Sequence, residues 1–555
     1  MTLILSISFM NKIKLFQVAF IFIVCLAFFL RIYNLQTIPP GVNRDEAAIG
    51  YNAYSLLLTG KDEYGKFLPI SLQSFGDWKL PVYIYETILT IKLFGLNEFA
   101  IRLPSALAGT ISVILAFFIV KQLFTDRKLA MVTMLLMAIS PWSLHLSRTT
   151  SEANMAVCLI SAGVLIFLKQ INKKSWLLLL TGILFALTFG TYAGNYVFTT
   201  LLSLGLFFLY RKELLRHRFG IATIITFIAL SSFLWLQTAG ANVTKISGIG
   251  IFGDPSIVNA RIVTPRNEHA NPQSILVKLL NNKINFGAEQ FAQNYVRAFS
   301  PEFLFIHGGG NHAHNILNFG NMYLVEAPFF FLGLALLFVQ KRGRSYYLVL
   351  LWLLIAPLAP SLTKDAPHTV RMFAIFPILP LVTALGLLWL VKIVPKIFYL
   401  PVIGIIFVLF ALNIGTYLDR YYVLFPYEES QNWGILYKKI NTIISQNEFA
   451  NRKVIMSEPN TSPYIYLLFY GAYDPKNYQN EAIRYPITED GFLHVKGFGR
   501  FTFRTVAFEE DLKQPNTLLI VRSDTVEAAI RNQYKTVDIA LPSGAPWFTI
   551  IQTNP

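Results

Sequence analysis

The sequence predicts a polytopic α-helical membrane protein with a small α/β domain outside the membrane at its C-terminal end. Three observations predict this fold class. Of the 555 residues, 54% are hydrophobic and only 14% are charged, which is too apolar for the surface of a soluble protein. Apolar stretches of about 20 residues, the length that crosses a bilayer, recur through the first three quarters of the chain. The last quarter has the composition of a soluble domain.

The membrane domain is expected to comprise residues 1–420 and about eleven spans. Most connections between the spans are short, but two long ones, 32–100 and 240–321, fall on the same side. The spans are placed near residues 14–31, 101–121, 129–146, 152–168, 175–192, 195–210, 219–239, 322–340, 345–362, 369–391 and 398–418.

Charge orients these spans, because Lys and Arg gather in alternate connections, which the positive-inside rule places in the cytoplasm. We therefore expect a cell-membrane protein, in a bacterial cytoplasmic membrane, with the N-terminus inside and both long loops and the tail outside. The formal net charge of +16 then reflects cytoplasmic loops and indicates no nucleic-acid partner. The cytoplasmic clusters are Lys12/Lys14, Lys121/Arg127/Lys128, Lys169/Lys173/Lys174, Arg211/Lys212/Arg216/Arg218, Lys341/Arg342/Arg344 and Lys392/Lys396.

The tail, residues 421–555, is expected to form the extracytoplasmic α/β domain. Helical patterns near 432–445 and 524–534 alternate with strand-like pieces near 452–456 and 517–521.

The densest polar cluster follows the first span, in IPPGVNRDEAAIGYNAYSLLLTG. Asn43 is a favourable N-cap and Glu46 has capping-box spacing, so a helix is predicted to begin here with Asp45 in its first turn. A helix N-terminus favours a charged carboxylate, as a general base requires. Asp45 and Glu46 are therefore either catalytic carboxylates at the membrane surface or residues that only complement the helix dipole.

Two cations later in the same segment are candidates for binding a phosphate. Lys79, in SFGDWKLPVYIYE, precedes an aromatic apolar run that is expected to lie in the membrane interface. It either neutralises a lipid phosphate or snorkels to the interface. Arg102, in LNEFAIRLPSALAG, stands at the outer entrance of the second span. We expect it to pair with a phosphate or with an acidic group of the preceding loop.

Two shorter outer connections also gather cations. Arg148 lies near His145 and Glu152 in SPWSLHLSRTTSEAN, and His368 and Arg371 open the tenth span in TKDAPHTVRMFAIFPILP. A guanidinium holds a phosphate through paired hydrogen bonds. Arg148, His368 and Arg371 are therefore predicted to bind substrate. The alternatives are an ion pair between Arg148 and Glu152 and simple snorkelling of Arg371.

The second long loop carries His307, His312 and His314 around three glycines. An H-x-H pair in a loop with no fixed partner is a weak metal signal. We predict no metal ligands and no required cofactor, with a divalent metal as the open alternative. Recognition of the acceptor or the sugar is the other interpretation of this loop.

Six motifs together resemble the GT-C glycosyltransferase superfamily, which includes the protein O-mannosyltransferases and the bacterial transferases that add aminoarabinose to lipid A. The resemblance covers roughly residues 12–420. It implies inverting transfer of a sugar from a polyprenyl-phosphate carrier to a protein, lipid or glycan acceptor on the outer face. The motifs are RDEAAIGY, DWKLP, FAIRLPSALAG, LSRTTSEAN, FSPEFLF and PHTVRMFAIFPILP.

The resemblance also implies roles for individual residues. Asp45 matches the family's catalytic base, with Glu46 as its neighbour, and Lys79 and Arg371 match contacts to the carrier phosphate. The family's pattern after the third helix has an Asp where this chain offers Glu152.

A secondary transporter or lipid flippase is the alternative from another class. Such proteins place ionisable groups or broken helices near the membrane midplane and often have paired halves. In this sequence the polar groups instead gather at one end of the spans, which favours the transferase.

Overall fold

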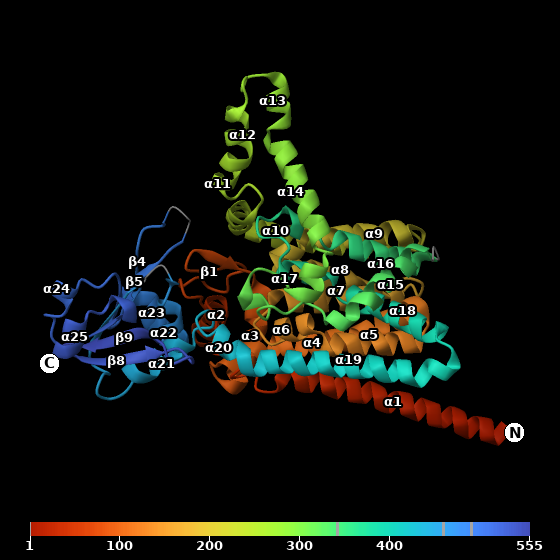
Figure 1. Ribbon diagram of the computed structural model, residues 1–555, viewed down its shortest axis with the longest axis horizontal. Coiled ribbons are helices and arrows are strands. Elements are labelled where there is room, and N and C mark those ends of the chain that lie inside the picture. Colours follow the sequence, from red (N-terminus) through yellow and green to blue (C-terminus); the bar gives the residue numbers. More distant parts are fainter. Residues whose placement is uncertain (1, 340–342, 458–460, 489–491, 555) are drawn as a thin grey trace. The chain divides into compact units, whose positions relative to one another are not determined.

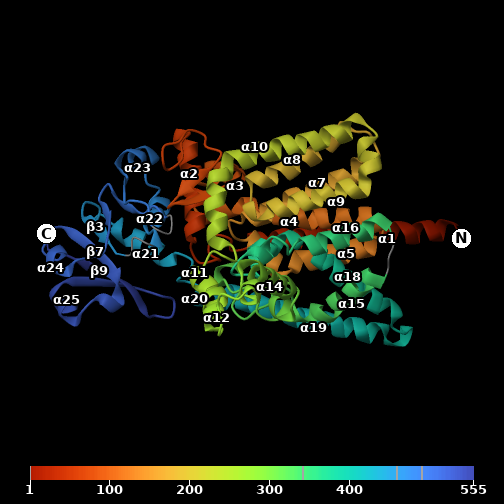
Figure 2. The ribbon, with the colours of Figure 1, turned by 90° about the horizontal axis from the view of Figure 1, so that it is seen from above.

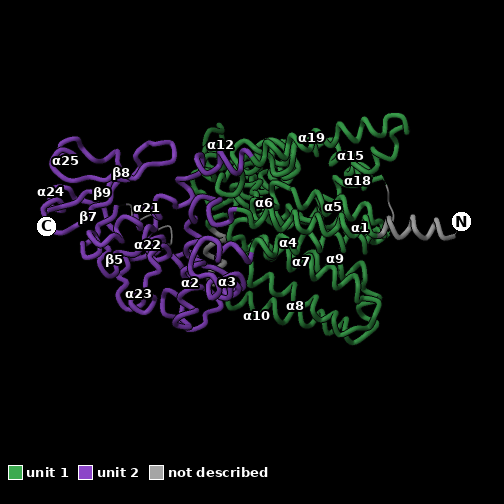
Figure 3. Tube along the Cα trace, turned by 90° about the horizontal axis from the view of Figure 1, so that it is seen from below, with its two compact units in different colours: residues 1–33, 105–418 green, residues 34–104, 419–555 purple. Residues whose placement is uncertain are grey.

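The computed structural model describes residues 2–339, 343–457, 461–488 and 492–554. The chain divides into two compact units (Figure 3). Unit 1 consists of residues 1–33 and 105–418, and unit 2 of residues 34–104 and 419–555. This division differs from the predicted domain boundary at residue 420, because the first long outer segment folds together with the tail.

Unit 1 is helical, and α8 packs along α10 while α15 packs along α18 (Figure 2). The second long loop forms short helices that project from the other helices of this unit (Figure 1). The principal helices are α1 (Thr2–Ile32), most of α4 (Glu98–Phe124), α5 (Arg127–Ile139), α6 (Pro141–Ser147), α7 (Glu152–Gln170), α8 (Leu179–Leu187), α9 (Tyr196–Leu215), α10 (Arg218–Ile249), α11 (Pro255–Val258), α12 (Thr264–Glu268), α13 (Ile275–Leu280), α14 (Lys283–Arg297), α15 (Ala327–Val339), α16 (Gly343–Ile355), α17 (Thr369–Met372), α18 (Ile378–Ile393) and α19 (Tyr399–Asp419).

The chain is a multi-pass membrane protein. Within the described residues, seven helices are long and apolar enough to cross a membrane, or nine if each of two bent pairs counts as one span. Two shorter apolar helices, Trp176–Gly190 and Leu324–Val339, lie in two further predicted ranges. Every one of the eleven predicted ranges thus contains helix, although length and composition support only seven to nine crossings. Lys341 and Arg342, and the end of the span predicted at 322–340, lie outside the described residues.

Proline marks both bends in the paired helices. The pair Arg127–Ile139 and Pro141–Ser147 bends by 56°, and the pair Thr369–Ile375 and Ile378–Ile393 bends by 60°. Pro141 occupies the first turn of α6, and Pro377 immediately precedes α18. Proline lacks an N–H and cannot continue the helical hydrogen bonds of the preceding segment, so each predicted straight span is broken here.

Unit 2 contains a seven-stranded sheet of order β4-β5-β6-β3-β7-β9-β8, in which β3 runs parallel to β6 and β7 and the other neighbours are antiparallel. The predicted α/β domain is therefore present. Its elements are α20 (Phe425–Glu428), α21 (Ile435–Ile444), β3 (Lys453–Met456), α22 (Tyr464–Tyr470), α23 (Pro475–Glu481), β4 (Ile483–Arg484), β5 (Val495–Phe498), β6 (Phe501–Phe503), α24 (Phe508–Asp511), β7 (Thr517–Arg522), α25 (Ala528–Gln533), β8 (Lys535–Ala540) and β9 (Pro546–Gln552).

Segment 34–104 adds α2 (Arg44–Thr59), a hairpin of β1 (Leu72–Ser74) and β2 (Asp77–Lys79), and α3 (Pro81–Phe94) to this unit. Gly41, with φ of +80°, lies directly against the Trp433 carbonyl, where a Cβ would clash. Gly434, with φ of +53°, lies in the same way against the Val42 carbonyl. The chain entering α2 is thus held backbone to backbone against the start of α21, an approach that only glycine permits.

Candidate active site

The start of α2 positions Asp45. The helix begins at Arg44, and the Asn43 side chain accepts a hydrogen bond of 2.9 Å from the Glu46 N–H. The predicted N-cap and helix are therefore confirmed. Asp45 lies in the first turn, and its side chain is 60% exposed. The helix N-terminus favours the charged carboxylate and leaves it accessible.

Lys79 holds Asp45 from the protein side. Its ammonium lies 2.6 Å from the Asp45 carboxylate and 2.6 Å from that of Asp77, and the lysine side chain is only 4% exposed. We predicted that Lys79 either contacts a phosphate or snorkels to the interface. Neither prediction included its pairing with the two carboxylates. In the structure the lysine neutralises two carboxylates, so its first effect is to fix Asp45 as an anion.

Asp77 was not singled out by the sequence analysis. Residues 77 and 79 belong to β2, and the two-residue turn of the hairpin is Phe75-Gly76. Side chains two residues apart on a strand point to the same face. The D-x-K spacing in DWKLP would have suggested this pair if the segment had been interpreted as a strand.

Arg102 forms a buried ion pair with Glu46. Its guanidinium donates to the Glu46 carboxylate at 2.8 and 3.2 Å and to the carbonyl oxygens of Leu35, Pro39 and Gly41. Both side chains are fully buried. Of the two partners expected for Arg102, the structure shows the acidic one, and substrate binding by Arg102 stays a prediction. The catalytic role predicted for Glu46 likewise stays a prediction, and in the structure its carboxylate is buried against Arg102.

A second buried carboxyl group, that of Glu63, lies in the loop that follows α2. Glu63 accepts a hydrogen bond of 3.0 Å from the Tyr464 hydroxyl and one of 3.4 Å from the Asn52 amide. Burial raises the pKa of Glu63 to about 8, although the Tyr464 hydrogen bond and the charge of Arg484 act in the opposite direction. No motif in the sequence pointed to this group.

His368 and Arg371 come together in unit 1. His368 caps α17, and its ring accepts hydrogen bonds from the N–H groups of Val370 and Arg371. The Arg371 guanidinium pairs with Asp365 and donates to the Thr363 hydroxyl at 3.0 Å. Arg371 therefore lies at the start of the tenth predicted span, as expected. Its guanidinium already binds the Asp365 carboxylate, so a phosphate would have to displace that carboxylate or bind beside it.

Arg148 is buried rather than presented to a substrate. It ends α6, is 1% exposed, and donates to the Leu30 carbonyl at 2.8 Å. Substrate binding by Arg148 stays a prediction, and in the structure its guanidinium is enclosed and donates to a backbone carbonyl.

The histidines of the second long loop contact different residues. His307 lies 3.6 Å from the Glu302 carboxylate, and the His314 ring lies 5.1 Å from that of His368. Across the described ranges, no group of three or more His, Cys, Asp or Glu side chains is arranged to hold a metal ion.

The predicted site residues thus fall into separate clusters. In unit 2 the fold brings Asp45 to Lys79 and Glu46 to Arg102. In unit 1 it brings His368 to Arg371. Of the residues in unit 2, Asp45 combines exposure, a helix N-terminus and a fixed cation, which is the combination a general base needs.

Comparison with known proteins agrees with this architecture. The family model for dolichyl-phosphate-mannose-protein mannosyltransferase matches residues 79–236. Among curated proteins no sequence match is found.

Solved structures match over a greater length. The crystal structure of ArnT from Cupriavidus metallidurans bound to undecaprenyl phosphate aligns with a TM-score of 0.52 and 11% identity over 98% of each chain. The apo state of ArnT gives 0.53 and 12% over the same shares. Oligosaccharyltransferase AglB from Archaeoglobus fulgidus, in complex with an inhibitory peptide and a dolichol-phosphate, gives 0.47 and 12%, with 83% of this chain and 64% of that chain covered. The chain has the fold of ArnT, and the resemblance to GT-C glycosyltransferases is confirmed at the level of fold.

Proposed function

We propose that this protein is an inverting glycosyltransferase that moves a sugar from a polyprenyl-phosphate carrier to an acceptor hydroxyl on the outer face of the cytoplasmic membrane. The observation that carries the proposal is Asp45, an exposed carboxylate in the first turn of α2 that is fixed by the buried Lys79. The topology, with the N-terminus inside and unit 2 outside, belongs to the same proposal.

The reaction needs one base and one leaving group. The acceptor oxygen attacks the anomeric carbon and forms the new glycosidic bond. The bond between that carbon and the phosphate oxygen breaks, its electron pair leaves with the polyprenyl phosphate, and Asp45 takes the hydroxyl proton. A single displacement inverts the anomeric configuration and needs no second carboxylate as nucleophile.

Lys79 has a defined part in this chemistry. Its charge keeps Asp45 ionised before the reaction, because a nearby cation favours the charged form of a carboxylate. When Asp45 accepts the proton, the ammonium loses one of its two anionic partners. Its positive charge is then less fully neutralised and stabilises through space the negative charge that develops on the departing phosphate.

The carrier class is supported by the fold, since ArnT in one matching structure is bound to undecaprenyl phosphate. The donor sugar is a hexose, with mannose as the first candidate from the family model, or a pentose. Arg371 remains the second proposed contact to the carrier phosphate, because it is partly exposed and its guanidinium already binds an oxyanion. No cofactor is needed for these steps.

The test is transfer of radiolabelled sugar from polyprenyl-phosphate mannose, and separately from polyprenyl-phosphate aminoarabinose, to an envelope extract by the purified protein. Asp45→Asn is expected to lower the rate by about 10²- to 10⁴-fold, the usual contribution of a general base. Asp474→Asn is the matched control, since Asp474 is the N-cap of α23 in the same unit and asparagine caps a helix equally well. Full transfer by Asp45→Asn would remove the proposed mechanism.

A further inference from the structure

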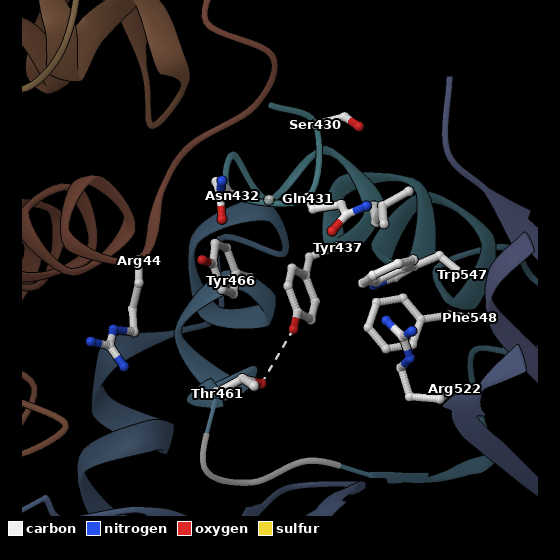
Figure 4. A pocket seen from close by; sticks show the side chains of 12 residues that line it. Arg44, Ser430, Gln431, Asn432, Tyr437, Thr461, Tyr466, Arg522, Trp547 and Phe548 are labelled. Atoms are coloured by element: carbon white, nitrogen blue, oxygen red, sulfur yellow. Dashed lines mark hydrogen bonds between the residues drawn. The ribbon is translucent and has the colours of Figure 1, made fainter. Parts of the chain in front are cut away.

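Unit 2 contains a pocket of about 420 Å³ next to the start of α2 (Figure 4). Its walls come from Arg44 of α2, from the segment that leads into α21, from Thr461 shortly before α22, and from the ends of β7 and β9. The volume is that of a ligand site rather than of a packing defect.

The pocket is positively charged. Arg44 and Arg522 lie on opposite sides of it (Figure 4), and among the described residues that line it none is acidic. Arg522 also lies 3.4 Å from Asp524, but that carboxylate is 69% exposed, so the pair is weak in water. Two arginines in the wall of one cavity favour an anionic ligand.

Aromatic rings form much of the remaining wall. Tyr437 and Tyr466 stack with ring centroids 4.3 Å apart and planes within 4° of parallel. The Arg522 guanidinium lies 3.4 Å from the ring centroid of Trp547. Apolar ring faces and hydrogen-bonding groups, such as the Tyr437 hydroxyl 3.3 Å from Thr461, suit a ligand with both C–H surface and hydroxyls.

The pocket is structurally tied to Asp45. Arg44 and Asp45 are consecutive, and the Arg44 guanidinium lies 4.6 Å from the ring centroid of Phe75, in the turn of the hairpin that carries Lys79. The wall of the pocket thus includes the residue that precedes the proposed base in α2.

We propose that this pocket binds an anionic saccharide, with a carboxylate or a phosphate group held by Arg44 and Arg522, and that it is the acceptor subsite. The assignment as acceptor subsite rests on the proposed function, whereas binding of the anionic saccharide does not. The cations fix the charged substituent, the rings contact the sugar faces, and the neighbouring hydroxyl is presented to Asp45.

The test measures dissociation constants by calorimetry on the full-length protein in detergent. The probes are trigalacturonic acid, mannose 6-phosphate and neutral maltotriose. At least one anionic probe is expected to bind about tenfold more tightly than maltotriose, and Arg522→Gln and Arg44→Gln are each expected to weaken it about tenfold, the loss of one charge-assisted contact. Lys513→Gln removes a cation from an exposed position of the same unit and is expected to change nothing.

The two anionic probes separate the sources of the charge. Tight binding of trigalacturonic acid alone identifies a carboxylate ligand, and tight binding of mannose 6-phosphate alone identifies a phosphate ligand. The proposal is overturned if no probe binds, if maltotriose binds as tightly as the anions, or if both arginine variants retain the wild-type affinity.

Asp45→Asn separates this proposal from the proposed function. It is expected to bind the anionic probe normally while transfer is lost. Probe binding without any sugar transfer by the wild type would leave the pocket standing and remove the transferase. Transfer that depends on Asp45, without binding of any probe, would support the transferase and remove the proposed ligand of the pocket.

Discussion

The Lys79 ammonium lies 2.6 Å from the carboxylate of Asp45, and the two side chains differ sharply in exposure, at 4% and 60%. The cation is enclosed by unit 2 and the anion faces outward. This asymmetry fixes the charge of the carboxylate from behind and leaves it accessible, and it leads to the first prediction.

Replacing Lys79 with methionine is expected to move the acid limb of the pH–rate profile of transfer to higher pH by about one unit, because a carboxylate without its ammonium partner retains its proton more tightly. The measurement is kcat/KM for transfer between pH 4 and 8. Lys438→Met is the control, since Lys438 pairs at 2.6 Å with Glu98 and not with Asp45. An unchanged acid limb in Lys79→Met would contradict the role given to the lysine.

The buried pair of Glu46 and Arg102 is expected to support the fold rather than the chemistry. Arg102→Met leaves the Glu46 carboxylate buried without this cation and should lower the free energy of unfolding by about 3 to 5 kcal/mol. Thermal unfolding in detergent provides the measurement. The double variant with Glu46→Gln should lose less than the sum of the two single losses.

Lys535→Gln is the control for this pair, because Lys535 and Glu448 lie 3.4 Å apart and are both exposed. Its effect should be below about 1 kcal/mol. A similarly small effect for Arg102→Met would show that the buried pair is not structural.

Glu63 gives unit 2 a pH-dependent stability. Its carboxyl group titrates near 4.5 in an unfolded chain and at about 8 in the fold. Between these values the folded state holds one more proton, so stability falls as the pH rises, by at most about 1.4 kcal/mol per unit. Above pH 8 both states are ionised and the loss is constant.

Glu63→Gln removes this titration. Its unfolding midpoint should therefore fall less between pH 5 and 8 than that of the wild type, as followed by intrinsic fluorescence. Glu509→Gln, at an exposed position of the same unit, should keep the wild-type slope. Equal slopes for Glu63→Gln and the wild type would mean that Glu63 is ionised in the fold.

The approach of Gly41 to Trp433 is expected to be needed for the position of α2. Gly41→Ala adds both backbone strain and a clash with the Trp433 carbonyl. Gly544→Ala adds comparable strain, at φ of +88°, with nothing within 4 Å of the new Cβ. Gly41→Ala should therefore destabilise by at least about 1 kcal/mol more than Gly544→Ala, as measured by thermal unfolding. Equal losses would show that the contact tolerates a side chain.

Arg371 and Asp365 should affect the carrier in opposite directions. Arg371→Gln is expected to raise the KM for the polyprenyl-phosphate sugar about tenfold, because a cation that binds the phosphate is lost. Asp365→Asn should lower this KM, since the phosphate no longer competes with a carboxylate for the guanidinium. Asp126→Asn, at the N-cap of α5 in the same unit, should leave it unchanged. Parallel changes in the two variants would assign Arg371 a structural role.

Features that depend on neighbouring residues could be predicted from the sequence. The helical ranges followed from runs of apolar side chains, and the start of α2 followed from Asn43 and its spacing to Glu46. Strands β3 and β7 lie where short β-rich runs predicted them. The predicted helix at 524–534 is only partly present, as a short 3-10 turn followed by α25. Its ends depend on packing against the sheet.

Features that depend on distant partners were decided by the tertiary structure. Arg102, Arg148 and Arg371 are all predicted at the outer ends of spans, yet Arg102 and Arg148 are buried and Arg371 is partly exposed. Whether an arginine meets a carboxylate, a carbonyl or solvent depends on how the chain packs around it.

The composition and the local patterns determined that this chain crosses a membrane many times and presents a carboxylate at a helix start. The tertiary structure decided which cation holds that carboxylate and which residues enclose the pocket beside it. Local patterns reflect hydrogen bonds and side-chain spacing within a few residues. The pocket joins residue 44 to residues near 437 and 548, and only the folded chain brings such positions together.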